Sequence, residues 1–349
     1  IDITGNLDLN AAIGNGATAG ATSIEVSGTS NIGANVTTSS TQQYDGVTTL
    51  STNVTLTTTD SNVTFNDKVI SDSTTNRNLT IDTNGNTGTA VFGNGTTDTV
   101  GVTNGYDLGV IDITGNLDLN AAIGNGATAG ATSIEVSGTS NLAADVTTSS
   151  TQTYTGAVTT DGSRTLQGST IQFASTVTGT TAASDDLTIT GALDLDGAIT
   201  DINDLYVSGT SNLGANITTT GTQEYNNNVT LSGAARTLTT SGDTVTFTGT
   251  VNGGQDLTVD TNGTDNSSSL ATVLFSSTVG DTTPVGAVLI TGNLDLDADI
   301  LQSDSTAGAT SIEVTGTSNL GANVKTTGDQ TYTGAVTLSA DVILTTTNN

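Results

Sequence analysis

Apolar and polar residues alternate along most of this chain in short runs. Examples are Val54–Thr57, Val63–Phe65, Leu117–Leu119, Leu187–Ile189 and Leu294–Leu296, in which Thr or Asp separates apolar side chains. Successive side chains of a β-strand point to opposite faces, so such runs predict strands of about three to five residues with one buried face. No stretch shows the sustained apolar period of a helix. The pattern therefore indicates an all-β chain.

Tight turns separate these predicted strands. The Asn-Gly pair, which is typical of tight turns, marks many of them. It begins at Asn15, Asn84, Asn94, Asn104, Asn125, Asn252 and Asn262.

The predicted strands are organised in long repeats, since residues 1–31 recur letter for letter at 111–141. One marker, Ser-Gly-Thr-Ser-Asn or its Thr-initial form, begins at Ser27, Ser137, Ser208 and Thr315. A second marker, Gln-x-Tyr, ends at Tyr44, Tyr154, Tyr225 and Tyr332. Both markers advance by 110, then 71, then 107 residues. The repeats are therefore approximately 1–110, 111–181, 182–288 and 289–349, and the last is incomplete.

The shortened second copy distinguishes between repeat architectures. A globular module cannot lose a third of its residues and keep its core, whereas a solenoid can lose whole coils because each coil contacts only its neighbours. At roughly 18 to 20 residues per coil, the missing residues fit two coils. We expect Asn78–Val100, which has no counterpart in the second copy, to be that pair. The sequence thus predicts one continuous parallel β-helix (β-solenoid) over 1–349, with on the order of 17 coils.

Two other structures compete with this interpretation. Tandem antiparallel sandwiches would suit Asn-Gly hairpins, but the second copy is too short, no Trp or Cys is present, and no linkers are visible. Disorder would suit a polar, Gly-rich chain, but the regular alternation of apolar residues and the 33% hydrophobic content argue against it. Aromatic residues make up 3% of the chain, and a narrow core of stacked Val, Ile, Leu and Ala has little need of large rings.

The charge balance excludes several partners. With 34 acidic against 5 basic residues the net charge is −29, so the chain lacks the clustered cations that bind nucleic acid. An anionic membrane surface would repel it, and we expect no membrane insertion. Like charges also oppose lateral strand pairing between molecules. The chain begins and ends at different phases of the repeat, so we expect more chain or another subunit to cover each end.

Acidic residues in alternation are the first candidates for chemistry. Asp194 and Asp196 lie two apart, as do Asp295, Asp297 and Asp299, and residues two apart on a strand share a face. Oxygen-rich rows suit Ca²⁺, which makes these five residues weak candidates for a calcium site. The competing interpretation is a solvated outer face with apolar residues between. We expect no other metal or cofactor.

Catalysis is not expected. Polysaccharide-cleaving β-helix enzymes use paired carboxylates with basic or aromatic platforms, yet this chain has no His and few cations. Asp8 and Asp118 stand in identical contexts, whereas a catalytic site is ordinarily singular. We therefore predict no catalytic and no cofactor-binding residues.

Three further patterns have simple structural explanations. Thr-x-Thr rows suggest an ice-binding ladder, but they fall at irregular phases and Thr is a common exposed strand residue. Asn-x-Thr sequons, which would accept glycans given a suitable host, are expected by chance in a chain rich in both residues. They include Asn35, Asn53, Asn62, Asn78, Asn216 and Asn228. The recurring tyrosines are expected to pack at a coil corner rather than stack on sugars.

The runs at 210–233 (TSNLGANITTTGTQEYNNNVTLSG), 317–347 and 277–300 resemble the repeats of giant bacterial surface proteins of the filamentous-haemagglutinin-like type. Such proteins are similar to two-partner-secreted exoproteins and autotransporter passengers. The resemblance touches all four copies and is specific for the repeat class. It implies a right-handed parallel β-helix exported to the cell exterior, with roles in adhesion, surface layers or fibres.

The function expected from these observations is structural. We expect a rigid segment of an extracellular bacterial fibre, sheath or surface array that assembles with copies of itself, or with neighbouring repeats of a longer chain, through its ends or sides. The alternative is a stalk segment of a giant adhesin that displays a binding module lying elsewhere.

Overall fold

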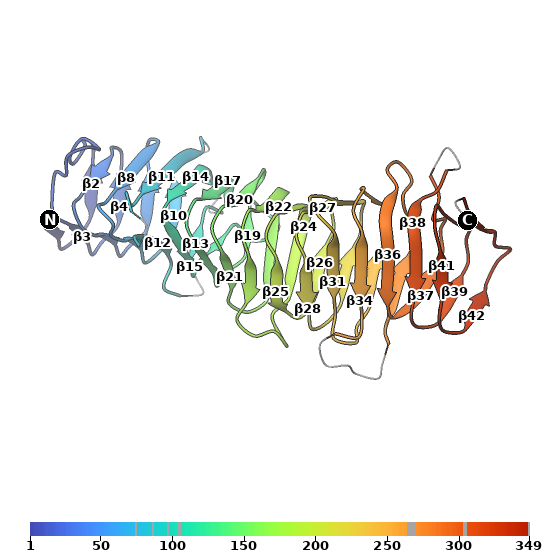
Figure 1. Ribbon diagram of the computed structural model, residues 1–349. Coiled ribbons are helices and arrows are strands. Elements are labelled where there is room, and N and C mark those ends of the chain that lie inside the picture. The colour runs from blue at the N-terminus through green and yellow to red at the C-terminus, as the bar shows by residue number, and fades with distance from the viewer. Residues whose placement is uncertain are drawn as a thin grey trace. The chain divides into compact units, whose positions relative to one another are not determined.

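The computed structural model describes residues 1–347 except 74, 86, 96–97, 103–105, 264–269 and 303–305. These residues form 43 β-strands and no helix, and the ladders between strands are parallel. The chain makes about 15 turns of a β-solenoid, which confirms the predicted all-β parallel β-helix (Figure 1). In this described part of the chain, no helix is long and apolar enough to cross a membrane.

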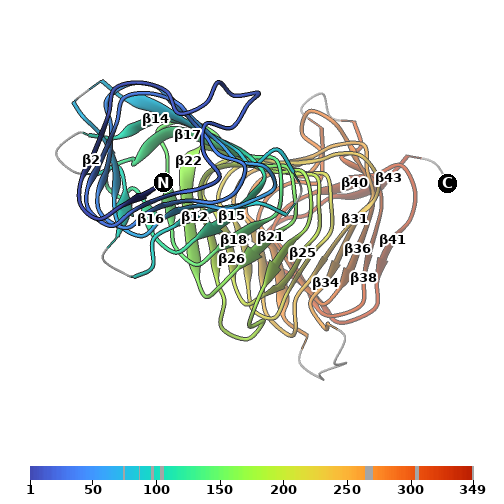
Figure 2. The same cartoon turned by 90° about the vertical axis from the view of Figure 1, so that its left-hand side faces the viewer.

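The chain divides into two compact units, Ile1–Ser175 and Thr176–Asn349. In each unit a coil contributes three strand segments, and each segment pairs with the corresponding segment of the next coil. Every unit therefore has three faces, which we name A, B and C in the first unit and D, E and F in the second. Figure 2 shows the chain winding through successive coils near the N-terminus.

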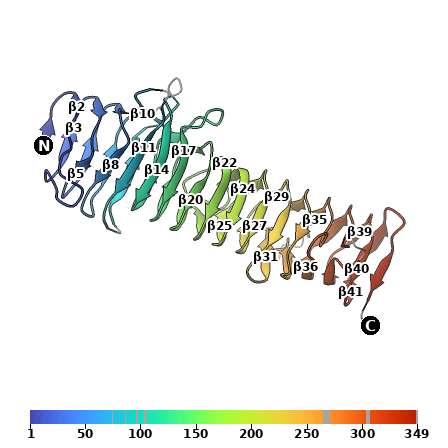
Figure 3. The ribbon, with the colours of Figure 1, turned by 90° about the horizontal axis from the view of Figure 1, so that it is seen from above.

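In the first unit, face A contains β1 (Asp2–Ile3), β3 (Ile24–Val26), β6 (Gln42–Tyr44), β9 (Val63–Phe65), β12 (Thr89–Phe92), β15 (Asn116–Leu119), β18 (Ser140–Leu142) and β21 (Val158–Thr160). Face B contains β2 (Leu7–Leu9), β4 (Ser30–Ile32), β7 (Thr48–Leu50), β10 (Val69–Ser71), β13 (Thr99–Val100), β16 (Ala122–Ile123), β19 (Val146–Thr147) and the first part of β22 (Arg164–Phe173). Face C, whose labels follow one another in Figure 3, contains β5 (Val36–Thr37), β8 (Val54–Thr57), β11 (Arg77–Asp82), β14 (Leu108–Thr114), β17 (Ala131–Val136), β20 (Gln152–Tyr154) and the second part of β22.

In the second unit, face D contains β23 (Val177–Gly179), β25 (Ile199–Ile202), β28 (Ile217–Thr219), β31 (Arg236–Thr239), β34 (Leu257–Asp260), β36 (Val285–Thr291), β38 (Ala309–Val314) and β41 (Gln330–Tyr332). Face E contains the first part of β24 (Leu187–Leu195), β26 (Leu205–Val207), β29 (Gln223–Tyr225), β32 (Val245–Phe247), β35 (Thr272–Phe275), β37 (Asn293–Leu296), β39 (Ser318–Leu320) and β42 (Val336–Leu338). Face F contains the second part of β24, β27 (Ser211–Leu213), β30 (Val229–Leu231), β33 (Val251–Asn252), the bridging residues Val279 and Ile300, β40 (Val324–Thr326) and β43 (Leu344–Thr346).

Each strand segment owes its burial to the alternation seen in the sequence. In β9 the side chains of Val63 and Phe65 are fully buried, whereas Thr64 between them is half-buried on the outer surface. Because parallel pairing keeps register, inward residues of successive coils stack on one another. The core of each unit is thus a set of apolar columns enclosed by three faces, a narrow version of the layered packing of larger domains.

Aromatic rings are concentrated in these columns. Tyr44 stacks on Phe65 with ring centroids 5.4 Å apart, and Phe65 stacks on Phe92 at 5.3 Å. The equivalent column in the second unit joins Tyr225, Phe247 and Phe275 at 5.3 and 5.0 Å. All five Phe residues of the chain lie in such stacks. Most buried core residues are Val, Ile, Leu and Ala, as expected, and the few rings present are stacked among them.

The sequence repeat and the coil repeat do not coincide. Leu7–Leu9 lies on face B, whereas its identical copy Leu117–Leu119 lies on face A. From β2 to β15 the described chain advances by 14 strand segments, with bridged Ile13 counted as a segment, and three segments make a coil. A long copy therefore equals four coils and two strands. In the second unit the same rule moves the Leu-Asp-Leu element from face F in β24 to face E in β37. Equivalent motifs thus shift by one face per copy.

The missing stretch of the second copy also proves to be one coil. Asn78–Val100 spans β11, β12 and β13, which lie on faces C, A and B and so make a single turn. Our expectation of two coils was wrong because coil length varies. Ile24 pairs with Gln42 after 18 residues, whereas Leu79 pairs with Ile111 after 32. The same variation gives about 15 turns where a constant coil length predicts 17.

Candidate functional site

The recurring motifs of the sequence meet across adjacent coils. In each copy the Asp of Leu-Asp-Leu accepts a hydrogen bond from the Asn that ends the Ser-Gly-Thr-Ser-Asn marker one coil later. The Nδ2–Oδ1 distances are 2.8 Å for Asn31 and Asp8, 3.0 Å for Asn141 and Asp118, 2.8 Å for Asn212 and Asp194, and 2.8 Å for Asn319 and Asp295. We call these the Asp–Asn pairs. Each pair joins the outward-facing middle residues of two strands that are paired in successive coils.

Glycines of the same motifs form a second contact between the two coils. The N–H of Gly138 donates to the carbonyl of Gly115 at 2.9 Å, and a Cβ at Gly138 would collide with that carbonyl. Gly115 itself has a φ of 142°, which residues with side chains rarely adopt. Gly115 N–H also donates to the hydroxyl of Ser137 at 3.1 Å. The glycine of the marker therefore permits two coils to approach backbone to backbone.

The sequons form a third set of coil contacts. In each of them an exposed or half-buried Asn is followed by a buried Val, Leu or Ile and then by Thr. The Asn Oδ1 accepts a backbone N–H of the next coil. The donors are Thr55 for Asn35 (2.9 Å), Asn78 for Asn53 (3.0 Å), Thr89 for Asn62 (3.0 Å), Val110 for Asn78 (2.9 Å), Thr237 for Asn216 (3.0 Å) and Thr250 for Asn228 (3.1 Å). We expected the Asn-x-Thr pattern to arise by chance. In the structure it arises because a corner Asn is followed by an inward and then by an outward strand residue.

The Gln-x-Tyr marker lies inside the core. Gln42 is fully buried, and its Nε2 donates to the carbonyls of Val36 (3.2 Å) and Thr57 (2.9 Å), which belong to neighbouring coils. Its Oε1 accepts the hydroxyl of Tyr44 at 3.1 Å. Gln152 with Tyr154 and Gln223 with Tyr225 repeat the arrangement. We call this the Gln–Tyr lock.

The environment of the lock fits a packing role. Burial raises the pKa of the Tyr44, Tyr154 and Tyr225 hydroxyls well above the usual value, so they stay protonated donors. These three rings are inaccessible to sugars, which confirms packing but places it within a face rather than at a corner. In the fourth copy, burial raises the pKa of the half-buried Tyr332 to about 12. Among the residues that the structure describes, none forms a hydrogen bond with the Tyr332 hydroxyl or with Gln330 Oε1.

Buried threonines close another corner. The hydroxyl of Thr38 donates to the carbonyl of Ser40 at 2.6 Å, that of Thr148 to Ser150 at 3.1 Å, and that of Thr219 to Gly221 at 2.8 Å. Each of these threonines is at most 4% exposed. Thr is therefore abundant for two reasons, since it serves as an outer strand residue and as a buried turn donor.

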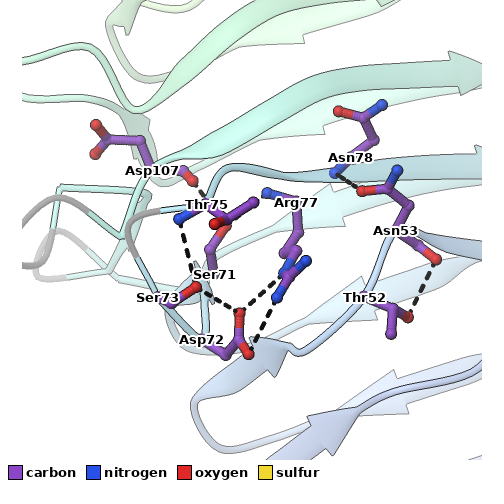
Figure 4. A network of polar contacts seen from close by, with 9 residues as sticks. All are labelled: Thr52, Asn53, Ser71, Asp72, Ser73, Thr75, Arg77, Asn78 and Asp107. Atoms are coloured by element: carbon purple, nitrogen blue, oxygen red, sulfur yellow. Dashed lines mark hydrogen bonds and ion pairs between the residues drawn. The ribbon is translucent and has the colours of Figure 1, made fainter.

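The arginines also bind backbone carbonyls or acidic side chains between or near the coils. Figure 4 shows Arg77, whose side-chain Nε lies 2.9 Å from Asp72 Oδ1. The backbone N–H of Arg77 donates to the Ser71 hydroxyl at 2.9 Å. Ser71 in turn donates to the Asp107 carbonyl at 2.7 Å. The Arg77 side chain holds the pKa of Asp72 below its usual value. The nearly buried Arg236 donates to the carbonyls of Ala234 (2.8 Å) and Gly214 (2.5 Å).

The five calcium candidates do not form the rows of carboxylates that the alternation predicts. Strand β24 ends at Leu195 and β37 ends at Leu296, so the alternation after Asp194 and Asp295 passes into turns. Asp196 is exposed there, and Asp299 Oδ1 accepts the Asn323 N–H at 2.7 Å. The expected row of three carboxylates on one strand was therefore wrong, because the chain turns after Leu296.

An open groove of about 560 Å³ does gather acids near this turn. Asp281, Asp297, Asp299 and Asp341 are among its lining residues. Within the described residues, no three His, Cys, Asp or Glu side chains are grouped as metal ligands would be. Calcium binding stays a prediction.

Sequence reasoning missed the Asp–Asn pairs and the Gln–Tyr locks. A usable signal was present, because Asp lies in the middle of Leu-Asp-Leu, Asn lies in the middle of Ser-Asn-Ile or Ser-Asn-Leu, and the two triplets lie one coil apart. Comparison with known proteins adds no identification, since no family model, curated protein or solved structure matches this chain.

Proposed function

We propose that this protein is a structural element, a rigid β-solenoid segment of an extracellular bacterial fibre, sheath or surface array. The observation that supports this proposal is the use made of the recurring residues. Asp–Asn pairs, corner asparagines, glycine contacts and Gln–Tyr locks all join one coil to the next. A β-solenoid with such contacts fits a structural repeat protein, in which stability adds coil by coil.

The mechanism is mechanical. Continuous backbone ladders, buried aromatic stacks and side-chain bonds between coils oppose separation of coils and exclude proteases from the strands. The high negative charge of each molecule opposes non-specific strand pairing between the sides of neighbouring molecules. Assembly then proceeds through defined ends or sides, either between copies or between neighbouring repeats of a longer chain. The resemblance to filamentous-haemagglutinin-like repeats favours a location outside the cell.

The alternative is a stalk of a giant adhesin. The same coil contacts would then hold a binding module at a distance from the cell surface, and this segment would bind nothing itself. We propose no enzymatic activity for either role, because the recurring carboxylates Asp8, Asp118, Asp194 and Asp295 are engaged in Asp–Asn pairs.

Electron microscopy of the purified protein in near-physiological salt tests the proposal. A fibre subunit is expected to give filaments with an axial repeat of about 4.8 Å between coils. Rods of uniform length that stay separate at high protein concentration would support the stalk. Strings of globules would contradict both roles. Added calcium chloride, compared with magnesium chloride at equal ionic strength, shows whether divalent cations promote assembly.

A further inference from the structure

The Asn-Gly pairs of this chain stand in unlike surroundings. Residues 15–16 and 125–126 occur within identical sequence and share two hydrogen bonds. Gly16 N–H donates to the Thr37 hydroxyl at 2.9 Å, and Gly126 N–H donates to the Thr147 hydroxyl at 3.1 Å. The carboxamide oxygens of Asn15 and Asn125 accept the backbone N–H groups of Thr18 and Thr128, each at 2.7 Å. In each pair, hydrogen bonds therefore engage both the Asn carboxamide and the N–H of the following Gly.

A third pair is held in another way. The carboxamide of Asn252 accepts the Thr282 N–H at 2.9 Å and donates to the Thr250 hydroxyl at 3.0 Å. Gly253 N–H donates to the Thr283 carbonyl at 3.3 Å.

The fourth pair is open. Asn84 is exposed, and neither its carboxamide nor the Gly85 N–H bonds to any described residue. Asn84 uses only its backbone N–H, which donates to Asp82 Oδ1 at 2.8 Å. Both residues line an open groove of about 600 Å³ that admits water.

The turn nevertheless favours this dipeptide. Asn84 has a φ of 48°, a left-handed conformation that Asn and Gly tolerate best. A Cβ at position 85 would collide with the Asp60 carboxylate, so glycine is needed there. The backbone angle at Asn84 and the nearby Asp60 side chain at position 85 therefore both favour the reactive sequence.

We propose that Asn84 is a site of spontaneous deamidation, and that Thr37 and Thr147 protect the Asn-Gly pairs at 15 and 125. Hydroxide removes the proton of the Gly85 N–H, and the nitrogen attacks Cγ of Asn84. The bond from Cγ to Nδ2 then breaks, the departing amine takes a proton from water, and ammonia is released with formation of a five-membered succinimide. Water then opens either ring C–N bond, which yields aspartate or isoaspartate. The change adds a carboxylate beside Asp82, and isoaspartate adds a methylene to the backbone of the turn.

Protection follows from elementary chemistry. A Gly N–H that donates to a Thr hydroxyl reacts more slowly, since this hydrogen bond must break before the Gly nitrogen can attack Cγ of the Asn. We expect Asn84 to react at least about tenfold faster than Asn15 and Asn125, the ratio that corresponds to one or two such hydrogen bonds. In denaturant the three rates should converge.

The test incubates the folded protein in mildly alkaline buffer and follows deamidation by peptide mass mapping. Trypsin separates the two identical copies, because Asn15 lies in Ile1–Lys68 whereas Asn84 and Asn125 lie in Asn78–Arg164. Fragmentation then locates the change within each peptide. Equal folded-state rates at Asn84, Asn15 and Asn125 would overturn the proposal.

Two variants test the protecting hydroxyl. Thr37→Val should accelerate deamidation at Asn15 and leave Asn125 unchanged, so the second copy is an internal control in the same molecule. Thr37→Ser keeps the hydroxyl and should leave Asn15 slow. A Thr37→Val protein in which Asn15 stays slow, or a Thr37→Ser protein in which it accelerates, would contradict protection by this group.

Discussion

Asn212 Nδ2 donates a hydrogen bond to Asp194 Oδ1 at 2.8 Å, and the two residues face each other on paired strands of successive coils. Asp194 had been a candidate for calcium, yet its carboxylate serves to join two coils. The same pair stands in all four copies, although its residues are 18 apart here and 23 or 24 apart elsewhere. Spatial register is therefore kept where sequence spacing is not.

Replacement of Asp194 by alanine should destabilise the second unit. The half-buried Asn212 loses its acceptor, and a charge-assisted hydrogen bond of this kind is worth about 1–2 kcal/mol. Chemical denaturation followed by circular dichroism measures the change. Asp196→Ala removes an exposed carboxylate two residues away and should stay within about 0.5 kcal/mol of the parent. Equal effects of the two substitutions would show that the Asp–Asn pair contributes nothing specific.

Loss of a Gln–Tyr lock should cost more than loss of an Asp–Asn pair. Gln223→Leu removes the side-chain donor to the Thr239 carbonyl and leaves the buried Tyr225 hydroxyl without its acceptor, for which we expect about 2–4 kcal/mol of destabilisation. Tyr225→Phe removes one hydrogen bond and keeps the ring stack on Phe247, so about 1 kcal/mol is expected. Urea unfolding of both variants gives the comparison.

The control for the lock lies on the same strand. Glu224 points outward between Gln223 and Tyr225, and Glu224→Gln should leave the unfolding midpoint almost unchanged. A Gln223→Leu protein as stable as this control would mean that apolar packing replaces the buried amide without penalty.

Acid should weaken the turn that contains Asp185. Burial of this carboxylate favours the neutral form, but the hydrogen bonds from Thr181 N–H (2.7 Å), the Thr180 hydroxyl (3.0 Å) and the Ser184 hydroxyl (3.3 Å) outweigh it and hold the pKa below the usual value. A lowered folded-state pKa contributes stability above the unfolded value of about 3.9, and this stability is lost as the pH falls through the folded pKa. The difference in unfolding free energy between the parent and Asp185→Asn should therefore be largest near neutrality and shrink below about pH 4. A difference that grows on acidification would reverse the assignment.

A whole coil should be removable. Deletion of 54–78 joins Asn53 to Leu79, and because Leu79 pairs with Val54, every later strand keeps its face. The ring of Tyr44 would then meet Phe92 in place of Phe65. We expect a folded protein with the same strand content per residue by circular dichroism and cooperative thermal unfolding.

Deletion of a single strand provides the contrast. Removal of 54–62 joins Asn53 to Val63 and moves every later strand of the first unit by one face, which sets unlike inward residues against each other. This shorter deletion should prevent folding of that unit. If it were tolerated as well as the larger one, the three-strand coil would not be the unit of stability.

Most of the secondary structure follows from the sequence alone. Alternation over Val63–Phe65 or Leu187–Ile189 decides strand and buried face together, because side-chain direction in a strand is a local property with a period of two. The repeat likewise predicts a solenoid, since only a quasi-linear fold tolerates a shortened copy.

The tertiary structure alone decided which residues meet. Asp8 and Asn31, or Gln42 and the Thr57 carbonyl, are joined by cross-coil register, and this depends on turn lengths that vary from coil to coil. For the same reason identical residues such as Leu9 and Leu119 lie on different faces, and identical asparagines are distinguished from Asn84 by their neighbours. Local alternation fixes how a strand faces the core, whereas the path of each turn fixes its partner.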